Sequence, residues 1–212
     1  MSWFLYSQDK VRLKTTLPSI FKASNLSYDY NPASMDSSQI VRAACCVAVK
    51  KHPDGMFNKA FLMSMNDGRE VIVKVPNLNA VVPHYTTASE VATMDFARKT
   101  LDTPVPRVYA WNSQAKTHPM SAEFIIMDKV KGVLLFQVWG TMKLPQKLKV
   151  LLAITYLQKQ WLRVSFFYYG SLYYAGDMQP SADSHYIKNS EVISDSDFMI
   201  GSATGRDWCD AG

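Results

Sequence analysis

The sequence has little cysteine, and none of its three cysteines is spaced as a metal ligand or an evident disulfide partner. Cys45 and Cys46 are adjacent, neighbouring cysteines rarely bridge each other, and Cys209 has no obvious mate. These spacings exclude the disulfide framework of a small secreted domain and a C-x-x-C zinc site. We therefore expect a chain from a reducing, intracellular compartment, with structural or incidental thiols.

Long apolar runs are also missing. The longest, Ala43 to Val49, has seven residues, whereas a membrane-spanning helix needs about 20. No secretory signal is present. The first 16 residues contain Lys10, Arg12 and Lys14 among hydroxyl side chains, which partly matches an organelle presequence, but Asp9 interrupts the pattern. The sequence predicts no membrane span and an intracellular location, and it leaves open whether the N-terminus is a cleaved presequence.

A basic stripe that would bind nucleic acid is lacking, although the net charge is +5. Residues 1–170 carry 21 basic and 11 acidic side chains, net +10, and residues 171–212 carry 2 and 7, net −5. The basic residues are scattered singly or in pairs such as Lys50-Lys51. This distribution favours an ordinary solvated surface over a nucleic-acid footprint. A basic half is still compatible with a small polyanion such as a nucleotide.

Strand patterns begin after a leader (1–38) that we expect to be irregular. Small and β-branched residues fill 43–49, an apolar segment covers 57–65, and a β-branched run covers 70–75. Between the last two, Asn66-Asp67-Gly68 predicts a tight hairpin turn, because these residues tolerate positive φ. The pattern predicts an antiparallel meander of three strands.

Helical patterns follow the meander. Thr87-Ala-Ser-Glu90 fits a capping box, with Thr87 at the N-cap and Glu90 at N3. Two short strands are predicted at 107–111 and 123–130, then a short helix at 133–139 and a longer one from Pro145 to Val164 with an apolar face. An extended segment is predicted at 168–175, and residues 176–212 show no convincing period. The order predicts an α+β fold with two lobes, 39–131 and 132–212.

Four segments in this order resemble the aminoglycoside phosphotransferase family, whose fold is protein-kinase-like. They are Met56–Phe61, Gly68–Pro76, Ser89–Arg98 and Pro104–Trp111. Glu123–Gly132 is similar to the hinge strand of that family, and Gly170–Tyr174 is similar to its fungal branch, which includes the proteins named for altered inheritance of mitochondria. The resemblance runs from about Arg42 to the end of the chain. It implies an antiparallel-sheet N-lobe with one helix, then a mainly helical C-lobe, and it implies mitochondrial localisation.

The resemblance also implies an ATP site. Lys74 would contact the phosphates, Glu90 would pair with Lys74, and the turn around Asp54-Gly55-Met56 would cover the nucleotide. Backbone groups from Met127 to Lys129 would read the adenine edge. The residues alone leave alternatives open: Glu90 would simply close the capping box, and Lys74 would be an ordinary surface lysine at a strand end.

The catalytic loop of the family, His-x-Asp with an Asn five residues after the Asp, is not found after the hinge. His185 is followed by Tyr186 and Ile187, and His52-Pro53-Asp54 lies before Lys74 and reads as a turn. We therefore expect a truncated C-lobe, no catalytic residues, no support for Mg²⁺, and phosphotransfer only from a longer product. The acceptor in the family, a small molecule or a protein, is not indicated. The alternative is a pseudokinase-type binding or scaffold protein without phosphotransfer.

Overall fold

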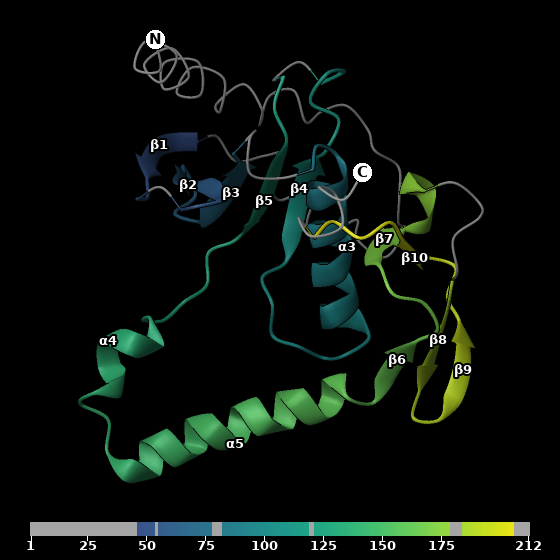
Figure 1. Cartoon of the computed structure of the whole chain (residues 1–212). Helices are drawn as coiled ribbons and strands as arrows, with labels where there is room; N and C mark the ends of the chain where they lie inside the picture. Colours follow the sequence, from purple (N-terminus) through teal and green to yellow (C-terminus); the bar gives the residue numbers. More distant parts are fainter. Residues whose placement is uncertain (1–45, 54, 78–81, 119–120, 179–183, 206–212) are drawn as a thin grey trace. The chain divides into compact units, whose positions relative to one another are not determined.

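The structure falls into two compact units, each described here by itself. It is a computed structural model that describes residues 46–53, 55–77, 82–118, 121–178 and 184–205 (Figure 1). The first unit comprises the chain up to Thr87 together with Arg107–Lys129; the second comprises Ala88–Pro106 and the chain from Val130. The expected leader (1–38), Asp54, Cys45 and Cys209 lie outside the described residues. The mixture of antiparallel sheets with helices is the expected α+β composition.

The first unit is built on a five-stranded antiparallel sheet with the order β1-β2-β3-β5-β4. Its strands are β1 (Cys46–Lys51), β2 (Asn58–Met65), β3 (Glu70–Pro76), β4 (Val108–Asn112) and β5 (Phe124–Asp128). Each lies within a few residues of its predicted position. The long-range pairing is between β3 and β5, where Lys74 stands opposite Ile125. The central strand of the sheet is therefore β3.

The predicted hairpin turn joins β2 to β3. Gly68 has φ 81°, in the left-handed region that favours glycine, and the Met65 N–H donates to the Arg69 carbonyl at 2.8 Å. The Asp67 carboxylate accepts the Arg69 backbone N–H at 3.0 Å and pairs with its guanidinium. These hydrogen bonds lower the pKa of Asp67. The turn prediction is confirmed.

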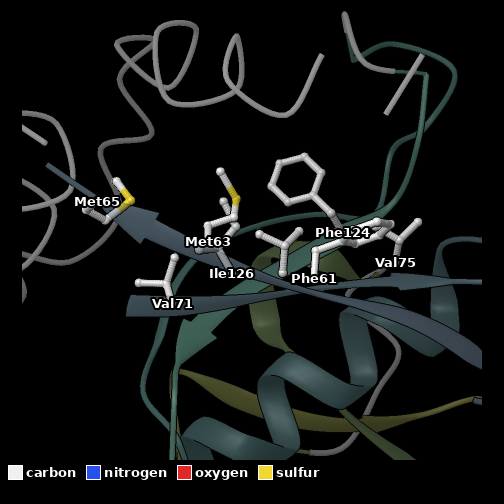
Figure 2. Close-up of a cluster of buried hydrophobic side chains, with 8 residues drawn as sticks. Phe61, Met63, Met65, Val71, Val75, Phe124 and Ile126 are labelled. Carbon is white, nitrogen blue, oxygen red and sulfur yellow. The ribbon is translucent and has the colours of Figure 1, made fainter. Parts of the chain in front are cut away.

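One face of this sheet carries the core of the unit. Alternate residues of β2 and β3 are buried, as the period of two in a strand requires. Figure 2 shows the labelled side chains gathered along this face. The cluster consists of Phe61, Met63, Met65, Val71, Val73, Val75, Phe124 and Ile126. The intervening residues of β2 and β3 therefore lie on the opposite face.

The second unit combines helices with two small antiparallel sheets. Its helices are most of α3 (Tyr85–Lys99), α4 (Leu135–Trp139), α5 (Leu144–Trp161) and the 3-10 turn η2 (Ala175–Asp177). Its strands are β6 (Val164–Phe166), β7 (Ser171–Tyr174), β8 (His185–Lys188), β9 (Glu191–Ser194) and β10 (Phe198–Gly201). One sheet has the order β6-β8-β9, and the other pairs β7 with β10.

An aromatic cluster holds α3 against these strands. The Phe96 ring meets the rings of Tyr186 and Phe198 edge-on, at centroid distances of 5.3 and 5.4 Å. Tyr174 stacks on Phe198, and its hydroxyl donates to Asp95 at 2.9 Å. Burial, and next the charge of Asp95, raise the pKa of Tyr174 far above its usual range.

Two expectations about this part of the chain were wrong. Residues after 176 form the strands β8, β9 and β10, although the sequence shows no convincing period there. β8 and β9 are joined by Asn189 and Ser190, which both have positive φ, at 53° and 68°. A hairpin turn without glycine gives a weak sequence signal. The long helix also ends at Trp161, so Val164 begins β6.

Candidate functional site

Lys74 lies near the C-terminal end of the central strand β3. Its cross-strand neighbours are Ala60 on β2 and Ile125 on β5. Because Val73 and Val75 point into the core cluster, the strand alternation directs the Lys74 side chain to the other face of the sheet. The residue is half-buried. The ammonium of Lys74 is thus carried on the face away from the apolar core.

Glu90 does not close a capping box. α3 begins at Tyr85, three residues earlier than an N-cap at Thr87 predicts, so Thr87 lies inside the helix and Glu90 lies beyond its first turn. The prediction of Thr87 as N-cap is wrong. Lys74 belongs to the first unit and Glu90 to the second, and their ion pair stays a prediction.

A buried carboxylate from another element holds the start of α3. Glu123, which is only 7% exposed, accepts the His84 backbone N–H at 2.7 Å and the Thr87 hydroxyl at 2.5 Å. A carboxylate at this position satisfies unpaired donors of the first turn and interacts favourably with the helix dipole. Sequence analysis missed this role because the cap comes from a residue about 40 positions away, immediately before β5.

His84 adds a second polar contact at the same place. Its Nδ1 lies 2.8 Å from the Ser113 hydroxyl and 3.1 Å from the Gln114 side-chain nitrogen. Both neighbours can donate, so both contacts are satisfied when Nδ1 accepts. His84 itself has φ 68°, and Ser113 is buried. The residue before α3 is therefore fixed by contacts on its backbone and on its ring.

The turn that would cover a nucleotide is tied to the end of β3. The Gly55 N–H donates to the Asn58 carbonyl at 3.0 Å. Asn77, which follows β3, donates its side-chain amide to the Met56 carbonyl at 3.1 Å and its backbone N–H to the Phe57 carbonyl at 2.9 Å. The Gly55 turn is therefore anchored three residues beyond Lys74. Sequence analysis did not single out Asn77.

The predicted adenine-reading segment is the end of β5. Met127 pairs with Ile72 and with Val108. The Lys129 ammonium forms an ion pair with Glu70 at 2.5 Å, with both side chains well exposed. The first compact unit ends at Lys129, but it leaves out Ala88–Pro106, which the predicted lobe 39–131 includes. Whether Met127 to Lys129 contact a nucleotide stays a prediction.

Asp128, between these two residues, is engaged with β4 and its approach. Its carboxylate accepts the Tyr109 hydroxyl and, at 3.2 Å, the Arg107 backbone N–H. Its own backbone N–H donates to the Arg107 carbonyl at 3.0 Å. Burial, and next the hydrogen bond to Asp128, raise the pKa of Tyr109. These contacts fix the backbone at the end of β5.

Within the described ranges, no three or more His, Cys, Asp or Glu side chains are grouped so that they could hold a metal ion. In the same ranges no helix has the length and apolar character needed to cross a bilayer.

Comparison with known proteins finds fungal relatives. The chain is 36% identical over 163 residues to a subtelomeric hrmA-associated cluster protein of Aspergillus fumigatus. It is 28% identical over 172 residues to the mitochondrial protein named altered inheritance of mitochondria protein 9 of Debaryomyces hansenii, and 27% identical over 165 residues to the protein of that name in Lachancea thermotolerans. No family model matches the chain.

The similarity covers most of this chain but a minor part of each relative. It spans 77% of the chain and 30% of the Aspergillus protein. For the two yeast proteins it spans 76% and 72% of the chain, and 26% of each relative. The chain therefore matches roughly a quarter to a third of the length of these relatives. The fungal part of the predicted resemblance is confirmed, since the relatives include proteins named for altered inheritance of mitochondria.

Proposed function

We propose that the first unit binds ATP as the N-lobe of an aminoglycoside-phosphotransferase-like kinase does. The observation that carries this proposal is the position of Lys74, half-buried on the central strand and on the face opposite the apolar core. A strand lysine in this position places a positive charge against the phosphates of a nucleotide, and phosphoryl-transfer proteins depend on such charges.

The other proposed roles follow from elements next to β3. The Gly55 turn would cover the phosphates, and Asn77 would hold that turn at a constant distance from Lys74. The backbone from Met127 to Lys129 would read the adenine edge. Glu90 would pair with Lys74; its place beyond the first turn of α3 removes capping as a competing role for its carboxylate.

The proposal is for nucleotide binding, with phosphotransfer incomplete on the residues of this chain. The His-x-Asp loop and the metal-binding acid expected for the family are not found in the sequence. An active phosphotransferase would need both. Metal ions stabilise the charge of the transferred phosphoryl group, and a catalytic base positions the acceptor. The acceptor would be a small molecule or a protein.

A second candidate is a binding or scaffold protein of the pseudokinase type. The observation in its favour is α5, an 18-residue helix with no buried residue. Binding of a protein partner that is unaffected by Lys74→Ala would support this function over nucleotide binding.

We also propose a mitochondrial location. The yeast relatives bear "mitochondrial" in their names, and the first 16 positions of the chain contain three basic residues and four serines or threonines. A fluorescent fusion to the C-terminus that stays outside mitochondria would reject this location.

Isothermal titration with ATP, with and without Mg²⁺, tests nucleotide binding. Lys74→Ala should weaken binding by tenfold or more, about 1.4 kcal/mol, because a phosphate contact is lost. The matched control is Lys59→Ala. Lys59 lies on the neighbouring strand β2, two residues before Phe61, and therefore on the core face of the sheet, opposite to the face that carries Lys74. Undetectable ATP binding by the unmodified chain at millimolar concentration, or equal losses in the two variants, would refute the proposal.

A further inference from the structure

Residues of helices α4 and α5 line an apolar hollow in the second unit that is open to solvent. Its volume is about 540 Å³. It is lined by Leu135, Phe136, Trp139, Gly140, Val150 and Ile154. Phe136 is 76% exposed, and its neighbour Leu135 is 44% exposed. Apolar side chains of this size are exposed in such a group where another molecule or segment binds.

The apolar side chains of α5 cover two separate sides of the helix. At about 100° per residue, the two groups lie about 130° apart around the axis. One side carries only leucines: Leu144, Leu148, Leu151 and Leu152. The other side carries a mixture of apolar side chains: Val150, Ile154, Leu157 and Trp161. We call the hollow and the leucine side together the α4–α5 surface.

Little of α5 is covered within its own unit. None of its residues is buried, and in Figure 1 most of the helix lies apart from strands β7 to β10 of that unit. Its C-terminal end is attached through Trp161, whose indole N–H donates to the Thr103 hydroxyl at 2.8 Å. A helix that is apolar on more than one side is normally enclosed on those sides. α5 therefore has apolar residues on two sides that its own unit leaves largely uncovered.

The positions of the polar residues around α5 favour a polypeptide partner over a membrane surface. A helix that lies on a membrane separates one apolar face from one strongly polar face. In α5 Lys147 and Lys149 lie in the two arcs between the apolar groups, and Lys159 lies among the leucines. No polar face is formed, so a lipid surface would cover only one of the two apolar sides.

The positive charge around the α4–α5 surface predicts acidic residues on the partner. Residues 129–176 contain seven basic and no acidic side chains. One of them, Lys147, lies over the Trp139 ring at 5.4 Å, at the rim of the hollow. A second copy of the same surface would bring like charges together. A complementary partner would instead present apolar side chains with acidic residues at the margin.

The relatives contain enough additional chain to supply such a partner. The matched part is 30% of the Aspergillus protein and 26% of the Debaryomyces protein, so more than two thirds of each lies outside the match. We propose that the α4–α5 surface is a polypeptide-binding interface and that, in the relatives, acid-flanked apolar segments from their own unmatched chain cover it. This inference uses no feature of the nucleotide site and stands independently of ATP binding.

Hydrogen exchange measured on two intact proteins tests the inference. The amides of Leu144 to Trp161 should exchange rapidly in the purified 212-residue chain. The aligned helix in the full-length Aspergillus relative should exchange at least 100-fold more slowly, because its opening requires loss of the covering segment. Equal exchange rates in the two proteins would overturn the proposal.

Co-expression of the 212-residue chain with the unmatched part of the Aspergillus protein is the second measurement. The two should copurify, and Leu148→Asp with Leu152→Asp should abolish this. Both leucines are exposed, at 49% and 69%, so the double variant should keep its circular dichroism and melting temperature. The control is Val192→Asp, a 62% exposed aliphatic on β9, which should still copurify.

Three other outcomes would reject the assigned partner. Copurification that persists in the double variant would place the interface elsewhere. Sedimentation with phosphatidylserine vesicles that depends on Leu148 and Leu152 would identify a lipid surface. A concentration-dependent dimer that protects Leu144 to Trp161 from exchange would identify a second copy of the chain.

Discussion

Glu123 should be a major determinant of the stability of the first unit, because it holds the start of α3 through two short hydrogen bonds. Glu123→Ala would remove the acceptor of the His84 N–H and of the Thr87 hydroxyl. Thr87 is only 2% exposed, so water would replace the lost acceptor poorly. A buried donor left unpaired costs about 1–3 kcal/mol. Glu123→Ala would leave two donors unpaired, but it would also remove the cost of burying a carboxylate. The free energy of unfolding should therefore fall by about 2–4 kcal/mol.

Urea unfolding followed by circular dichroism would measure this loss. Glu123→Gln keeps one acceptor oxygen and should cost about half as much. Thr117→Ala serves as control, since its hydroxyl makes a longer, exposed bond of 3.3 Å to the Gln114 carbonyl. The amides of the first turn of α3 should also exchange faster in Glu123→Ala. A loss below about 0.5 kcal/mol, the range of ordinary surface substitutions, would refute the capping role.

Three further changes test other contacts. Asn77→Ala should accelerate hydrogen exchange in the Gly55 turn, because the side-chain hydrogen bond to the Met56 carbonyl is lost. The melting temperature should fall by no more than a few degrees, since two main-chain hydrogen bonds of the turn remain. Unchanged exchange would disprove the anchoring. Tyr174→Phe should lower the free energy of unfolding of the second unit by about 1–2 kcal/mol, measured in urea, because its hydroxyl donates to the Asp95 carboxylate; a neutral result would show that this bond contributes nothing. Leu152→Asp should reduce light scattering by concentrated protein without loss of stability, since the side chain is 69% exposed; unchanged scattering would place the aggregating surface elsewhere.

Local patterns predicted the first unit well. The Asn66-Asp67-Gly68 turn and the alternation of β2 and β3 depend on neighbouring residues only, so a single sequence contains the information. The same alternation placed Lys74 on a strand, and the register with Ile125 then determined its face. The pairing of β3 with β5 could not be predicted from these patterns, because it joins residues about fifty positions apart.

The helix start and the C-terminal strands were predicted poorly for physical reasons. Thr87 and Glu90 have the right spacing for a capping box, but the helix begins three residues earlier, where the buried carboxylate of Glu123 accepts the His84 N–H, and no local pattern reveals this contact. The strands β8 to β10 are four residues each and lack a glycine turn, so their period is too short to recognise. The apolar residues of α5 could be read from the sequence, and none of the residues of this helix is buried in the described part of the chain.

The first unit is discontinuous in the chain, and this has a consequence for how it can fold. Strands β4 and β5 reach the sheet only after residues 88–106 have been synthesised, yet β5 is the neighbour of the central strand β3. A nascent chain of which only the residues up to about 100 have left the ribosome would contain the antiparallel strands β1, β2 and β3. One edge of β3 would then be unpaired, because β5 is still missing. Such an edge templates association with other chains. A single cut in the chain cannot separate the first unit from the second, so any expressed version of the first unit must retain α3 and its connections through Lys129.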